Sequence, residues 1–218
     1  MKHRSAQAQL HLTEVRARAV LVSARTPLVK AARGLVKSYD ERLRKCHTQQ
    51  VLRAMTGALS AGLREALEPL LQEVESLNEH IQEYDRRIGK MSKVAYPETA
   101  LLKQIKGVGD LIGTTYVLTM EDPHRFRKSR DAGCFVGLQP GRSNSRESEP
   151  QMRISKEGDE YLRTLLVQGA HYILGPFGED SDLRRWDRSW RREEGKTPRS
   201  GRWWRWRASW RYCCTGCG

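Results

Sequence analysis

Apolar side chains recur along residues 1–46 at steps of three, four and seven, the spacing of one face of an α-helix. The positions that carry this pattern are Leu12, Val15, Ala19, Val22, Val29 and Val36. Pro27 falls inside the pattern. Because proline lacks a backbone N–H and its ring crowds the preceding turn, we expect it to kink or split this helix.

A second helix is predicted to begin near Ser60. Its apolar residues alternate steps of four and three for about four heptads, a spacing typical of coiled coils. They are Leu63, Leu67, Leu70, Val74, Leu77, Ile81, Tyr84, Ile88 and Met91. This seam can pair with the first helix in a hairpin, with another chain in a dimerisation rod, or with both. We expect a homo-oligomer that forms through the heptad helix.

A helix-hairpin-helix is predicted where a short helix ends in Gly107-Val108-Gly109 and a new apolar helix runs to about Met120. Two glycines allow a tight turn, and the first N–H groups of the next helix are free to hold a DNA phosphate without reading bases. Lys103 and Lys106 flank the turn and add positive charge. The alternative is a plain helical corner of a packed domain.

Polar and basic segments follow the predicted hairpin. Asp122-Pro123 indicates a turn, and a local basic cluster follows it, made of Arg125, Arg127, Lys128 and Arg130. This basic cluster is either a phosphate contact or a solvated loop. We expect a helix within 132–139 that ends in a turn at Gly137, a polar loop over 140–152, and a helix over about 160–174 that begins after an Asp159 N-cap.

Charge adds a candidate partner to this mainly α-helical chain. The formal net charge is +13, and Lys and Arg outnumber Asp and Glu by 12 to 3 in residues 1–60. Such a chain favours a polyanion, and DNA is the partner we expect. No apolar run is long enough to cross a membrane and no secretory leader is evident, so we expect a cytoplasmic protein.

The chain resembles one family over about residues 1–186, and most specifically in 101–186: the insertion-sequence transposases called family one-ten, with its eleven-eleven subgroup. The first helix and the heptad helix resemble the coiled-coil segment of that family. The matching stretches are Gly107-Val108-Gly109, Asp122-Pro123 with Arg125-Phe126, Phe135-Val136-Gly137-Leu138, Asn144-Ser145, Ser148-Glu149-Pro150-Gln151, Arg153-Ile154-Ser155-Lys156-Glu157-Gly158-Asp159, Tyr161-Leu162-Arg163 and Leu165-Leu166-Val167-Gln168-Gly169-Ala170. The resemblance implies an N-terminal RuvC-like domain with four metal-binding acidic residues, a coiled coil and a serine-bearing C-terminal domain. It also implies a guide RNA and DNA recombination through a covalent serine intermediate.

Ser145 matches the catalytic serine of this family, and Ser143 is the fallback nucleophile if the alignment slips. A serine hydroxyl needs activation before it can attack a phosphodiester. Arg142, Arg153 and Lys156 lie near in sequence and can offset phosphate charge. The sequence departs from the family after the serine, where Arg146 stands in place of the usual glycine.

The chain shows no acidic tetrad, so we expect no metal site of its own. The divalent metal that the family implies, magnesium, belongs to the missing RuvC-like domain. We therefore expect a transposase remnant that binds nucleic acid and does not recombine DNA alone. Two alternatives remain: a non-enzymatic DNA- or RNA-binding protein, and a coiled-coil partner that inhibits a full-length transposase.

Residues 187–218 have an unusual composition. All six Trp lie between Trp186 and Trp210, and Cys214-Thr215-Gly216-Cys217 forms a CxxC without a second ligand pair. Codon choices exist that turn this segment, shifted by one base, into the continuation of the family, so we infer a frameshift after Trp186 and an unstructured tail. The expected division is 1–95 helical or coiled coil, 96–186 serine-bearing domain, and 187–218 tail.

Overall fold

The protein is mainly α-helical, as predicted, in a computed structural model that describes residues 5–43, 57, 59–139, 141, 153–176 and 178–193. Its helices are α1 (Ala6–Lys37), α2 (Ala61–Val94), α3 (Thr99–Lys103), α4 (Asp110–Met120), the 3-10 helix η3 (Pro123–Arg125), α5 (Ser129–Phe135), α6 (Glu160–Leu174) and α7 (Asp182–Glu193). They fall into two compact units, Ser5–Met91 and the part from Ser92 onward.

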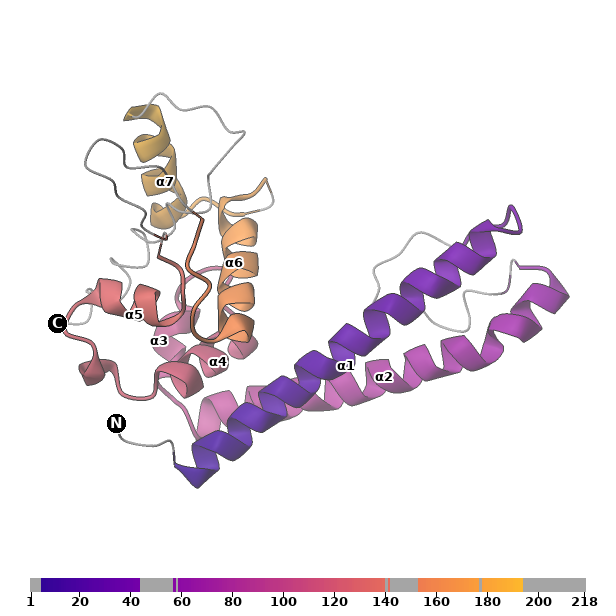
Figure 1. The fold of residues 1–218 in the computed structure, drawn as a ribbon, viewed down its shortest axis with the longest axis horizontal. Helices are drawn as coiled ribbons and strands as arrows, with labels where there is room; N and C mark the ends of the chain where they lie inside the picture. The colour runs from indigo at the N-terminus through magenta and orange to yellow at the C-terminus, as the bar shows by residue number, and fades with distance from the viewer. Residues whose placement is uncertain are drawn as a thin grey trace. The chain divides into compact units, whose positions relative to one another are not determined.

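The unit Ser5–Met91 is a hairpin of two long helices that lie along each other (Figure 1). Apolar residues of α1 pack against those of α2 in one cluster, which includes Val29, Ala32, Val36, Leu63, Leu67, Leu71 and Val74. Two ion pairs join the N-terminal half of α1 to the C-terminal half of α2. Arg18 donates to Asp85 at 2.5 Å, and Arg87 donates to Glu14 at 2.6 Å. The heptad seam therefore pairs with the first helix of the same chain.

Two details of the hairpin differ from the sequence prediction. Leu71, 1 % exposed, occupies the core position expected for Leu70, which is only partly buried. A straight helix has 3.6 residues per turn, so a strict heptad drifts and a neighbouring leucine enters the seam.

The second difference is at Pro27, where α1 continues without a split and ends at Lys37. Pro27 and Ser23 both lie on the exposed side of the helix, where water can satisfy the carbonyl that loses its N–H partner.

The part from Ser92 onward is built from short helices, in which α3 packs on α4, α4 on α6 and α6 on α7. Its core gathers Met120, Val136, Leu162 and Leu166. The predicted helix over 160–174 is confirmed in full, including its cap, since the Asp159 side chain accepts from the Leu162 N–H. The helix predicted within 132–139 begins earlier, at Ser129, and ends at Phe135. The turn predicted at Gly137 is confirmed, since Gly137 has a positive φ of 73°.

Helix α7 continues past residue 186, where the unstructured tail was predicted to begin. Asp182 stands in its first turn, where a carboxylate stabilises the helix dipole, and Asp187 is buried. The expectation of an unstructured tail is therefore wrong for 187–193, and the rest of it lies outside the described residues. Among the described helices, none is long and apolar enough to cross a membrane.

Candidate nucleic-acid interface and serine segment

The Gly107-Val108-Gly109 turn joins α3 to α4, and its two glycines have different environments. Gly107 has φ +96°, and a Cβ added there would lie 2.8 Å from Ile173 Cγ1 of α6. Gly109, the N-cap of α4, has extended backbone with φ −92° and ψ −177°, and a Cβ there would meet open space. Gly107 is therefore required by the fold, whereas Gly109 leaves the start of α4 accessible.

A polar cluster holds the start of α4 in place. Ser92 Oγ lies 2.8 Å from Thr99 Oγ1 and 3.1 Å from Asp110 Oδ1, and Lys103 Nζ donates to the same Asp110 oxygen at 2.6 Å. Partial burial raises the pKa of Asp110, but the hydrogen bonds from Lys103 and Ser92 outweigh it and lower the pKa below its ordinary value. The cluster links the end of α2, α3 and α4.

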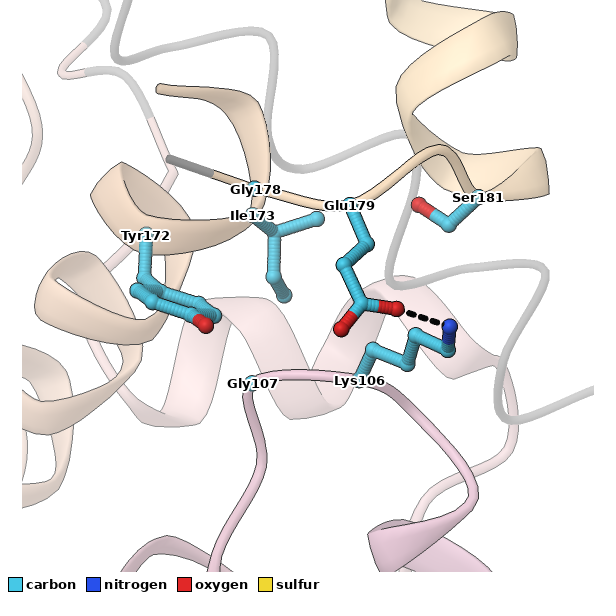
Figure 2. A pocket seen from close by; sticks show the side chains of 7 residues that line it. All are labelled: Lys106, Gly107, Tyr172, Ile173, Gly178, Glu179 and Ser181. Carbon is cyan, nitrogen blue, oxygen red and sulfur yellow. Dashed lines mark hydrogen bonds and ion pairs between the residues drawn. The ribbon is translucent and has the colours of Figure 1, made fainter. Parts of the chain in front are cut away.

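Both lysines predicted to contact phosphate at this turn form ion pairs. Lys103 pairs with Asp110, and Lys106 pairs with Glu179, which follows α6 (Figure 2). The pair with Glu179 raises the pKa of Lys106 and lowers that of Glu179, mainly through their hydrogen bond. Both lysines remain exposed, so a phosphate has access to them only in competition with these carboxylates.

The basic cluster after η3 is also exposed. Arg125 places its guanidinium over two aromatic rings, 5.4 Å from the centroid of Phe126 and 4.7 Å from that of Phe135. This cation–π contact orients Arg125. Arg127 and Lys128 are solvent-exposed, and the backbone N–H of Lys128 is bound by the Asp131 carboxylate at the start of α5.

Backbone hydrogen bonds join residues 137–139 and Gly141 to residues 153–156, and we call this structure the stem. The Gly141 N–H donates to Arg153 O at 2.8 Å, the Ser155 N–H to Gln139 O at 2.8 Å, and the Lys156 N–H to Gly137 O at 3.1 Å. The stem brings together the two ends of the segment 142–152. That segment contains Arg142, Ser143 and Ser145, which lie outside the described residues.

The stem is anchored by Arg163 of α6, which is only 8 % exposed. Its Nη1 donates to Val136 O at 3.0 Å and to Glu157 O at 3.1 Å, one carbonyl on each side of the stem. The two sides approach so closely that a Cβ on Gly137 would lie 1.9 Å from Glu157 O. A buried guanidinium shared by two carbonyls fixes the separation of the two backbone segments.

Arg153 and Lys156, predicted to offset phosphate charge, lie on the stem and are exposed. Lys156 has φ +59°, a conformation that residues other than glycine rarely adopt. Within the part of the chain that the structure describes, no group of three or more His, Cys, Asp or Glu side chains could hold a metal ion. The described acidic, histidine and cysteine side chains therefore do not form a site that fits the magnesium ion implied by the family resemblance.

Sequence reasoning missed three residues of this region: Arg163, Tyr172 and Glu179. Arg163 was quoted only as part of a motif, because nothing local shows that an arginine on α6 reaches two distant carbonyls. Tyr172 lies outside the apolar stripe of α6 and is 52 % exposed. An aromatic residue out of phase with the buried face of a helix was the available signal for it.

Residues 99–179 match the sequence model of the IS116/IS110/IS902 family of transposases. The transposase for insertion sequence element IS1111A of Coxiella burnetii is 30% identical over 160 residues, which cover 71% of this chain and 44% of the relative. A probable family 20 transposase of Pseudomonas aeruginosa is 29% identical over 191 residues, or 84% of this chain and 56% of the relative. The transposase for IS1328 of Yersinia enterocolitica is 35% identical over 99 residues, 45% of this chain and 29% of the relative.

The chain thus spans about half the length of the first two curated relatives, with 44% and 56% covered. The matched region contains the glycine turn, the basic cluster after η3, the stem and its anchor Arg163. Through residues 99–179, the chain belongs to the IS116/IS110/IS902 family of transposases.

Proposed function

We propose that this chain is the nucleic-acid-binding, serine-bearing part of an insertion-sequence transposase, and that it acts in DNA transposition with Ser145 as its nucleophile, not autonomously but together with a metal-binding transposase domain. The observation that carries the proposal is the family match over residues 99–179, together with the stem inside it. Within the stem, the Gly141 N–H donates to Arg153 O at 2.8 Å.

In the proposed reaction, the Ser145 hydroxyl oxygen bonds to a DNA phosphorus. The serine hydroxyl gives up its proton to solvent as this bond forms. One deoxyribose oxygen leaves with the electron pair of the broken P–O bond and takes up a proton from solvent, so the phosphodiester energy is kept in a phosphoserine link. Arg153 and Lys156 are exposed on the stem, where they can offset the charge on the phosphate. No step is assigned to a metal ion, since the described residues offer no group of ligands.

The proposed partners follow from the same surface. DNA binds through the exposed side chains of Lys103, Lys106, Arg125, Arg127, Lys128, Arg153 and Lys156, with the backbone of Gly107 and Gly109 at the turn. Arg142 is proposed for the same role. A guide RNA and a homo-oligomer formed through α2 complete the proposal, and DNA binding places the protein at the bacterial nucleoid.

The nucleophile is tested by trapping a covalent adduct between the chain and end-labelled DNA carrying family terminal sequences. Wild-type protein should give a labelled band that survives denaturing electrophoresis, Ser145→Ala should give none, and both should bind the DNA equally in fluorescence anisotropy. Ser143→Ala is the matched control and should keep the adduct. Loss of the adduct in Ser143→Ala but not in Ser145→Ala would move the role to Ser143.

A second candidate function is nucleic-acid binding without catalysis. The exposed basic side chains support it. Under this alternative, wild-type protein binds DNA tightly and forms no adduct. A third candidate is a partner that inhibits a full-length transposase through the α1–α2 hairpin, and co-purification of the two proteins would support it.

A further inference from the structure

A small pocket of about 270 Å³ lies beside the glycine turn (Figure 2). Lys106 and Gly107 come from the turn, Tyr172 and Ile173 from the end of α6, and Gly178, Glu179 and Ser181 from the segment before α7. Its volume is slightly below the usual range for small-molecule sites. It is too small for a duplex, so only part of an unpaired strand could enter it.

The two sides of the pocket differ in chemistry. Figure 2 shows the Tyr172 ring on one side and the Lys106–Glu179 pair on the other, with Ile173 between them. Tyr172 is 52 % exposed, whereas Ile173 is 5 % exposed and gives the pocket an apolar wall. An accessible aromatic ring beside a cation is the arrangement with which proteins bind an unpaired base and its phosphate.

Glu179 is the only carboxylate lining this described pocket, and the fold places it on Lys106. The chain folds back after α6, where a Cβ on Gly178 would lie 2.2 Å from Ile173 O. The side chains of Lys106 and Glu179 are 63 % and 66 % exposed. Exposed ion pairs contribute little to stability, so a phosphate can replace this carboxylate at low cost.

We propose that this pocket binds one unpaired nucleotide of a nucleic-acid strand, with the base stacked on Tyr172 and the phosphate replacing Glu179 at Lys106. The proposal rests on the nucleic-acid binding proposed above and adds the form of the ligand. Glu179 then acts as an internal competitor that weakens binding of strands unable to place a phosphate and a base together. An unpaired DNA strand and an unpaired RNA strand offer the same chemistry.

The test measures fluorescence anisotropy with three labelled probes: a short oligothymidylate, the matching oligouridylate and a DNA duplex of equal length. Glu179→Gln should tighten single-strand binding, and Lys106→Gln should weaken it. The matched control is Asp182→Asn, which removes an exposed carboxylate from a different ion pair, that with Arg185, and changes the net charge equally. Equal effects of Glu179→Gln and Asp182→Asn would overturn the role of Glu179.

The stacking part is tested with Tyr172→Leu and the conservative Tyr172→Phe. Tyr172→Leu should weaken binding of the preferred single strand by about fivefold or more and leave duplex binding unchanged, while Tyr172→Phe keeps wild-type affinity. An equal loss on single strand and duplex would overturn it. Wild-type protein that binds no nucleic acid refutes the proposed function itself, whereas wild-type binding that none of these variants alters refutes only the pocket. Whichever of the oligothymidylate and the oligouridylate binds more tightly identifies the strand in the pocket as DNA or RNA.

Discussion

Replacing the two glycines of the turn one at a time should have very different effects on stability. Gly107→Ala puts a side chain at φ +96° and a Cβ at 2.8 Å from Ile173 Cγ1 and 3.1 Å from Tyr172 Cδ1. A left-handed conformation costs a residue other than glycine about 1–2 kcal/mol, and overpacking costs about 1–3 kcal/mol. We therefore expect Gly107→Ala to lower the free energy of unfolding by about 3 kcal/mol.

Gly109→Ala should change the same free energy by less than about 0.5 kcal/mol. Its φ of −92° suits any residue, and its Cβ meets open space. Alanine is a poorer N-cap than glycine, but it also restricts the unfolded chain, so the two effects oppose each other. Gly109→Ala therefore serves as the matched control for Gly107→Ala.

Tryptophan fluorescence can follow these changes through Trp186, which lies on α7, and no Trp lies in Ser5–Met91. Urea unfolding of wild type, Gly107→Ala and Gly109→Ala, followed at this signal, gives the three free energies. Equal stability of the two variants would refute the assignment of Gly107 to a position that excludes a side chain.

Other predictions concern buried or paired polar groups. Asn78→Ala removes the acceptor that Arg25 Nη1 holds at 2.8 Å in the hairpin core, so it should cost about 2 kcal/mol in urea unfolding followed by circular dichroism. Arg25→Leu with Asn78→Leu should recover that loss, and a double variant less stable than Asn78→Ala would contradict this. The lowered pKa of Asp110 contributes stability above pH of about 4 that is lost as acid protonates it, so Asp110→Asn should flatten the fall in stability at lower pH. Arg163→Met should speed hydrogen exchange at the Ser155 and Lys156 amides, which donate across the stem; unchanged exchange would mean that Arg163 is not the anchor.

The helices with strong local signals were the ones that sequence predicted best. Helix α6 carries an apolar stripe, an Asp159 cap and a Gly175-Pro176 stop, and each acts within a few residues of the boundary it sets. The turn at Gly107 was predicted for the same reason. Local signals could not show that Pro27 lies on the solvent side of α1, where its missing hydrogen bond costs little.

The candidate site depended on contacts between distant parts of the chain, and sequence reasoning predicted less of it. The basic residues were identified from their charge, but the Glu179 that pairs with Lys106 lies 73 positions away. Arg163 reaches Val136 across 27 positions. No periodicity or capping rule reports such contacts. Ser143 and Ser145 stay predictions, since they lie outside the described residues.

The buried Arg25–Asn78 contact has a consequence for how the hairpin aligns. If α2 slid by one heptad in one direction, Arg25 would face the apolar Leu71, and in the other direction Asn78 would face Ala32. Either slip would leave a buried polar group without its partner, whereas a purely apolar seam would tolerate both. One polar pair can thus select a single register for two helices of more than thirty residues each.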